Sequence, residues 1–167
     1  MSKAEPDIAE QRPRTFAELV EACQSQVKEV FPWDLTERLE SENDILLLDV
    51  REPYEFDAMR IDGSVNVPRG VLESACDYGY EETIPELVES RDREIVIICR
   101  SGYRSLLAGL VMQQMGFRSV SSLKTGLRGW SEFEQELVNA EGKPVSFDDA
   151  DEYFMPRLRP EQLGPSK

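Results

Sequence analysis

The hydrophobic pattern of the chain contains two continuous apolar runs of strand length, Ile45–Val50 (ILLLDV) and Glu94–Cys99 (EIVIIC). Runs without polar alternation are typical of strands that are buried on both faces, as in parallel sheets. Two shorter stretches, Ser64–Val67 and Ser119–Leu123, predict further strands of the same sheet.

Between these strands, apolar residues recur at helical spacing. The first such segment is Thr15–Val30, and Thr15 with Glu18 gives it a capping box. The pattern predicts further helices over residues 34–40, 54–59, 70–76, 84–90, 104–115 and 130–138. Strands that alternate with helices predict an α/β fold, in which a small parallel β-sheet carries helices on both faces.

The same pattern divides the chain into three parts. Residues 1–33 form a polar arm followed by the amphipathic helix, and residues 34–137 carry all the predicted strands. Residues 138–167 contain prolines and an acidic run, DDADE, so we expect an acidic tail that packs loosely or binds a partner.

Charge and histidine content restrict the function. The chain has 167 residues, a net charge of −14 and no histidine. An acidic surface repels nucleic acid and anionic membranes, so we expect neither as a partner. Without histidine, the Ser-His-Asp triad, the Cys-His pair and His-ligated metals are excluded. We therefore expect no metal or cofactor.

The three cysteines, Cys23, Cys76 and Cys99, have no CxxC spacing, and an odd number does not suggest a disulfide framework. The polar N-terminus lacks the apolar core of a signal peptide, so we expect a cytoplasmic protein. Cys23 lies on the apolar stripe of the first helix and is interpreted as buried and inert. Cys76 is interpreted as a small apolar residue unless it lies near Cys99.

The candidate chemistry lies in the segment Cys99-Arg100-Ser101-Gly102-Tyr103-Arg104-Ser105, between a buried strand and the next helix. In parallel sheets, sites lie beyond the carboxyl ends of the strands. The unpaired N–H groups and the dipole of a helix N-terminus favour a thiolate or a persulfide anion. Gly102 lets the loop curl inward. Arg100 and Arg104 add positive charge, which predicts a small anionic substrate.

With these residues in view, the sequence resembles the rhodanese-like domain family from residue 34 to about residue 137. The matching pieces are ILLLDVREPYEF at 45–56, IDGSVNVP at 61–68, IVIICRSGYRS at 95–105, LVMQQMGF at 110–117 and LKTGLRGW at 123–130. The resemblance implies a rhodanese-type sulfurtransferase. Cys99 would take sulfur from thiosulfate or another small anionic donor and pass it to cyanide, a thiol or a protein.

The resemblance also assigns roles to the loop. Residues 100–105 would form the cradle that follows Cys99, with Arg104 binding the donor and the Ser101 and Ser105 hydroxyls bonding the sulfur or capping the helix. Three further residues are expected to act by support: Asp49 holds the loop, and Arg51 pairs with Glu55. Arg69 is interpreted as a solvated arginine, with a place at the border of the pocket as the alternative.

Three other readings stay open. The first is a slow persulfide carrier or a docking module in a sulfur relay. A related fold hosts cysteine phosphatases, whose loop has five residues between cysteine and arginine, whereas this chain has four between Cys99 and Arg104. A redox-sensing or arsenate-reductase-like enzyme would need a resolving cysteine, for which Cys76 is the candidate. The oligomeric state does not follow from the sequence.

Overall fold

The computed structural model describes residues 11–41 and 44–165. Most of the expected N-terminal arm, residues 1–10, and the last two residues of the expected tail lie outside this range. The described part contains a five-stranded sheet with the order β1-β5-β4-β2-β3, and every neighbouring pair is parallel. The strands are β1 (Lys28–Val30), β2 (Ile45–Asp49), β3 (Val65–Asn66), β4 (Glu94–Ile98) and β5 (Ser119–Leu123). The predicted α/β fold is confirmed.

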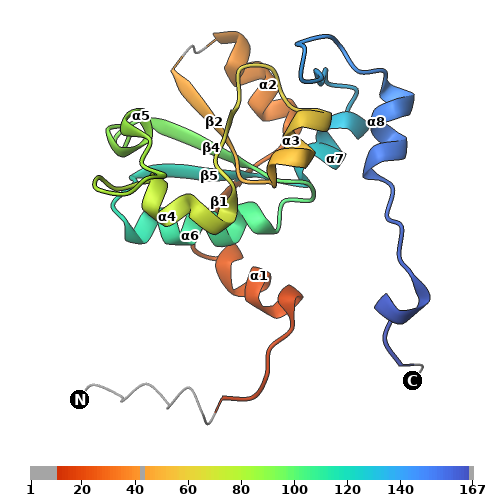
Figure 1. The fold of residues 1–167 in the computed structure, drawn as a ribbon, viewed down its shortest axis with the longest axis horizontal. Coiled ribbons are helices and arrows are strands. Elements are labelled where there is room, and N and C mark those ends of the chain that lie inside the picture. The colour runs from red at the N-terminus through yellow and green to blue at the C-terminus, as the bar shows by residue number, and fades with distance from the viewer. Residues whose placement is uncertain (1–10, 42–43, 166–167) are drawn as a thin grey trace.

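Eight α-helices lie before, between and after these strands in the described residues (Figure 1). They are α1 (Phe16–Gln24), α2 (Pro32–Ser41), α3 (Pro53–Ala58), α4 (Leu72–Ala75), α5 (Pro85–Val88), α6 (Arg104–Gln114), α7 (Gly126–Glu132) and α8 (Phe147–Phe154). Two short 3₁₀ turns, Arg69–Val71 and Pro160–Gln162, complete the elements. The predicted capping box of α1 is present, because Thr15 and Glu18 each accept the other's backbone N–H at 3.2 Å.

The alternation of side chains along β2 and β4 gives the sheet two apolar faces. Leu46 and Leu48 pack in one cluster with residues of α4, α5 and α6, whereas Ile45 and Leu47 pack in a second cluster with residues of α2, α7 and α8. Helix α1 lies outside α6, where Val20 and Cys23 pack against Leu106 (Figure 1). The helices therefore cover both faces of the sheet, with α1 as an extra layer.

Two sequence predictions about element boundaries are wrong. The helix expected over Thr15–Val30 ends at Gln24, and Lys28–Val30 instead pairs with β5 as an edge strand. The apolar spacing of Val27 and Val30 fits a helix, but pairing along β5 satisfies the backbone of this stretch. The helix expected over residues 130–138 begins four residues earlier, at Gly126.

The expectation of loose packing after residue 138 is also wrong for α8. Ser146 caps this helix, and its hydroxyl accepts the N–H of Asp149 at 3.1 Å. Ala150 and Phe154 are each only 2% exposed, and they join the apolar cluster that contains Leu127 and Trp130. Helix α8 is therefore part of the core. Among the described residues, no helix is long and apolar enough to cross a membrane.

Candidate functional site

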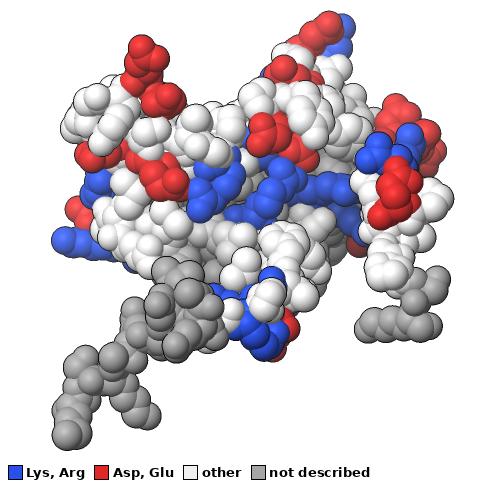
Figure 2. Space-filling view, turned by 60° about the horizontal axis from the view of Figure 1, so that its bottom comes forward, with Lys and Arg blue, Asp and Glu red and all other residues white. Residues whose placement is uncertain are grey.

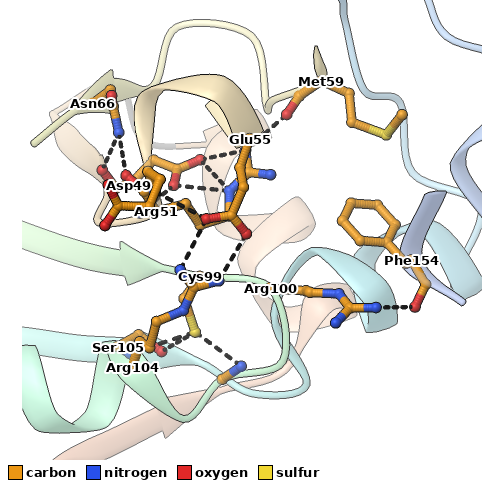
Figure 3. A network of polar contacts seen from close by, with 12 residues as sticks. Asp49, Arg51, Glu55, Met59, Asn66, Cys99, Arg100, Arg104, Ser105 and Phe154 are labelled. Atoms are coloured by element: carbon orange, nitrogen blue, oxygen red, sulfur yellow. Dashed lines mark hydrogen bonds and ion pairs between the residues drawn. The ribbon is translucent and has the colours of Figure 1, made fainter. Parts of the chain in front are cut away.

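Cys99 lies directly after β4, at the carboxyl edge of the sheet, and only 1% of its surface is exposed. Its Sγ accepts the backbone N–H of Gly102 at 3.1 Å and that of Ser105 at 3.4 Å (Figure 3). The Ser105 hydroxyl lies 3.3 Å from the same sulfur and 2.6 Å from the hydroxyl of Ser122. The loop and the first turn of α6 thus surround the sulfur with hydrogen-bond donors, an arrangement that favours an anion there.

Gly102 gives the loop its shape. Its φ of +86° belongs to the left-handed region, which side chains rarely adopt. A Cβ atom at this position would lie 3.0 Å from the amide nitrogen of Thr125 and 3.1 Å from the carbonyl oxygen of Leu123. The turn after β5 therefore presses against the Cys99 loop, and this close approach requires glycine.

Of the two serines that sequence reasoning singled out, only Ser105 contacts the sulfur. Ser101 lines the pocket in front of Cys99, but its side chain has no hydrogen bond to the sulfur. Tyr103 is 51% exposed at the mouth of the same pocket.

Arg104, expected to bind the donor, makes a two-pronged ion pair with Glu55. Its Nη1 and Nη2 each donate to one carboxylate oxygen of Glu55 at 2.9 Å (Figure 3). Burial raises the pKa of Glu55, but the hydrogen bonds from Arg104 and from the backbone N–H of Glu52 outweigh it, so the pKa is lowered overall. The pair fastens the start of α6 to α3.

The expected pair between Arg51 and Glu55 is therefore wrong. Arg51 instead binds Asp49, with Nε–Oδ1 at 3.0 Å and Nη2–Oδ2 at 2.8 Å, and both side chains are fully buried. Arg51 also donates to the carbonyl oxygen of Met59 at 2.7 Å. Its guanidinium faces this carbonyl, which leaves the Glu55 carboxylate to Arg104.

Asn66, which sequence reasoning missed, holds the same turn from β3. Its Nδ2 donates to the carbonyl oxygens of Asp49 and Arg51, both at 3.0 Å (Figure 3). Asp49 and Arg51 are thus held by contacts between the end of β2, the end of α3 and strand β3. This position suits a supporting role. The only sign in the sequence was an asparagine between the two valines of the predicted Ser64–Val67 strand.

Arg100 and Arg69 each have a partner that the sequence did not indicate. Nη2 of Arg100 donates to the carbonyl oxygen of Phe154 at 2.7 Å, which ties the Cys99 loop to the end of α8 (Figure 3). Arg100 still lines the pocket. Arg69 does not line it and pairs with Glu73, one helical turn further on. Arg69 therefore does not border the pocket, which leaves the surface arginine that the sequence favoured.

The pocket in front of Cys99 has a volume of about 200 Å³. It is lined by Phe16, Cys99, Arg100, Ser101, Tyr103 and Arg104. Figure 2, in which the side of the molecule that carries α1 comes forward, shows Lys and Arg side chains gathered in a band across its middle. Phe16 was missed as a site residue because helical spacing placed it on the apolar stripe of α1, yet 52% of its surface is exposed.

Cys76 differs chemically from a resolving cysteine. It is completely buried, and this burial raises its pKa to about 11, despite the opposing effect of Arg91. A thiol with so high a pKa is almost entirely protonated near neutral pH. All three cysteines are free.

Comparison with known families matches residues 32–133 to the model of the rhodanese-like domain. The chain belongs to the rhodanese-like domain family. The match begins at α2 and ends after α7, so α1, with Phe16, and α8 lie outside it. Helices α1 and α8 thus flank the matched region, one on each side.

Three relatives illustrate the similarity. A sulfurtransferase of Allochromatium vinosum is 31% identical over 70% of this chain and 99% of its own length. A Bacillus subtilis protein named as a candidate sulfur carrier is 31% identical over 78% of this chain, which spans only 65% of that protein. A solved structure from Rhodopseudomonas palustris, described as a possible tyrosine phosphatase, is 26% identical, with a TM-score of 0.67 over 75% of this chain and 96% of that one.

Proposed function

We propose that the protein is a sulfurtransferase that carries sulfane sulfur as a persulfide on Cys99. Small anions such as thiosulfate are the proposed donors, and thiols, proteins or cyanide are the proposed acceptors. The observation that carries this proposal is the geometry at Sγ, where Gly102 and Ser105 direct their N–H groups at the sulfur. These donors suit the negative charge that Sγ carries before the sulfur is loaded and again after the sulfur has left.

In the first proposed step, the Cys99 thiolate attacks the outer sulfur of thiosulfate. The Sγ–S bond forms, the S–S bond of thiosulfate breaks, and sulfite leaves with the electron pair. In the second step, an acceptor anion attacks the outer sulfur of the persulfide and restores the Cys99 thiolate. With cyanide the product is thiocyanate, and with a thiolate it is a new persulfide.

Arg104 is the proposed anchor for the donor's negative oxygens. A guanidinium has five N–H groups, and Glu55 takes two of those on Arg104. The remaining groups are available at the pocket that Arg104 lines. We expect Arg104→Ala to raise KM for thiosulfate, and an unchanged KM would contradict this role.

The proposed function is tested by intact-protein mass spectrometry after incubation with thiosulfate. Wild type should gain the mass of one sulfur atom, and cyanide or dithiothreitol should remove it. Cys99→Ser should gain nothing, whereas Cys76→Ala, the matched control, should behave as wild type. Absence of the added sulfur with thiosulfate, polysulfide and protein persulfide donors alike would refute the proposal.

The solved structure described as a possible tyrosine phosphatase makes phosphoryl transfer the second candidate. The loop argues against it here, because only four residues separate Cys99 from Arg104 and Glu55 already occupies two N–H groups of that arginine. Hydrolysis of p-nitrophenyl phosphate by wild type and not by Cys99→Ser would favour the phosphatase.

A sulfur carrier is the alternative to a general sulfurtransferase, and the rates with two acceptors distinguish them. Slow turnover with cyanide together with fast transfer to a protein thiol would identify a carrier, and fast turnover with both acceptors would identify a general sulfurtransferase. We place the protein in the cytoplasm, where a reducing environment would keep its three free cysteines as thiols.

A further inference from the structure

A second hollow adjoins the Cys99 pocket, and two residues line both of them. This hollow, of about 300 Å³, lies along α1. It is lined by Phe16, Ala17, Val20, Glu21, Gln24 and Tyr103. Phe16 and Tyr103 line both hollows, and their rings meet edge to face with centroids 6.0 Å apart. Apart from Tyr103, the second hollow is built from a helix outside the matched family region of residues 32–133.

The shared walls are aromatic and half exposed. Phe16 is 52% exposed and Tyr103 51%, while Val20 beside them is only 4% exposed. Large aromatic side chains held at the surface are typical of protein–protein contacts, because they bury much area with little loss of side-chain freedom. Here the aromatic pair borders a buried sulfur nucleophile, so a partner that covers the pair also reaches Cys99.

The charges at the two hollows are opposite. Arg100 and Arg104 line the Cys99 pocket, whereas the exposed Glu21 lines the hollow along α1. Glu21 has no ion-pair partner in the part of the chain that the structure describes. A ligand that spans both hollows would therefore be complemented by a positive charge at its α1 end.

We propose that the α1 hollow is the docking site of the sulfur acceptor, and that this acceptor is an extended segment of a partner protein. The segment presents a cysteine to the Cys99 pocket, an apolar side chain to the α1 hollow and a basic residue to Glu21. An extended chain places alternate side chains on one side, about 6.6 Å apart, so the apolar residue is two positions from the cysteine. This inference rests on the proposed sulfurtransferase function and names its acceptor.

The transfer step is balanced without any further reactant. The partner's cysteine loses its proton to solvent, and its thiolate attacks the outer sulfur of the Cys99 persulfide. The bond between this sulfur and Sγ breaks, and Sγ leaves as the thiolate held by Gly102 and Ser105. The partner departs as a persulfide.

The test uses two synthetic peptides that each contain one cysteine and a lysine near one end. One has leucine two residues on either side of the cysteine, and the other has asparagine at both places. We expect the sulfur-loaded wild-type chain to transfer to the leucine peptide about tenfold faster, which corresponds to about 1.4 kcal/mol. Burial of a leucine side chain can supply this difference.

Two matched variants of α1 localise the effect. Ala17 lines the α1 hollow, whereas Ala22 is also exposed on the same helix but lies outside both hollows. Ala17→Arg should bring the ratio of the two peptide rates close to one. Ala22→Arg should keep the wild-type ratio and the wild-type rate of transfer to dithiothreitol. Arginine is a good helix former, so both variants retain α1.

If the wild-type chain transferred sulfur to the two peptides at nearly equal rates, the inference would be overturned. It would also be overturned if Ala22→Arg lowered the ratio of the two rates as much as Ala17→Arg does. Failure of the proposed function is distinguishable, because the wild-type chain would then gain no sulfur mass. Docking is also measured without chemistry, by fluorescence anisotropy of the labelled peptides with the Cys99→Ser chain. Tighter binding of the leucine peptide would support the inference, and equal binding would refute it.

Discussion

The ion pair between Glu55 and Arg104 gives a prediction about both stability and pH. The Glu55 carboxylate accepts two N–H groups of Arg104 and the backbone N–H of Glu52. In Glu55→Gln, the amide keeps one acceptor oxygen and loses the charge. Hydrogen bonds to charged groups contribute about 1.5–3 kcal/mol each. The N–H groups of Arg104 that lose their partner can hydrogen-bond to water, because its side chain is 33% exposed, and this reduces the loss of stability. We therefore expect the free energy of unfolding to fall by about 2 kcal/mol near pH 7.

The pH dependence follows from the lowered pKa of Glu55. In the unfolded chain this carboxyl takes up its proton at a higher pH than in the folded protein, so acid favours unfolding. The stability that Glu55 contributes is complete above the ordinary range of a glutamate, about pH 4.3, and is lost as the pH falls through the lowered folded pKa. The difference between wild type and Glu55→Gln should therefore shrink on acidification.

Urea unfolding of both chains, from about pH 7 to about pH 3, measures this difference at an unchanged m-value. Glu132→Gln is the matched control, because Glu132 is 61% exposed and its pair with Arg128 lies at the surface. Its effect should stay below about 0.5 kcal/mol. A loss in Glu55→Gln no larger than the control, or a difference that persists in acid, would refute the reasoning.

Three further predictions concern other parts of the chain. Thr125 has φ +66° at the start of α7, a conformation that favours glycine, so Thr125→Gly should raise the free energy of unfolding by roughly 0.5–1 kcal/mol. Thr36→Gly within α2 is the control and should lower the free energy of unfolding. A lower free energy of unfolding in Thr125→Gly would contradict the reasoning. Phe154→Ala should cost about 3–5 kcal/mol in urea unfolding if α8 belongs to the core. The next residue, Met155, is 61% exposed, and an equal cost for Met155→Ala would argue against the core role. Cys76, with its pKa of about 11, should resist iodoacetamide at about pH 8, where about one thiol in a thousand is ionised, and equal labelling of folded and urea-unfolded chains would disprove it.

The sequence by itself was sufficient for the centre of the fold. A strand buried on both faces needs apolar residues at nearly every position, so β2 and β4 appear as apolar runs that only Asp49 and Glu94 interrupt at their ends. Because Cys99 directly follows β4, a parallel sheet places it at the carboxyl edge, and Gly102 indicates the tight turn around its sulfur. These features are local, because each depends on the residue and its immediate neighbours in the chain.

Other features depended on tertiary contacts. Edge strand β1 is stabilised by pairing with β5, and this pairing has no signal in a three-residue segment with helical spacing. Helix α8 shows only a short amphipathic pattern within an acidic stretch, and its packing depends on the surface that α7 offers.

The partners of charged residues were also decided by the tertiary structure. Spacing along the chain favoured a pair between Arg51 and Glu55. In the structure Glu55 instead pairs with Arg104, which lies 49 residues further along the chain on another helix. Phe16 likewise reaches the Cys99 pocket because α1 packs on α6. Local sequence determines which residues form strands, turns and caps, since those depend on short-range periodicity and backbone preference. Which side chains meet at the site depends on how the elements pack, because a contact between distant residues leaves no periodic pattern in the chain.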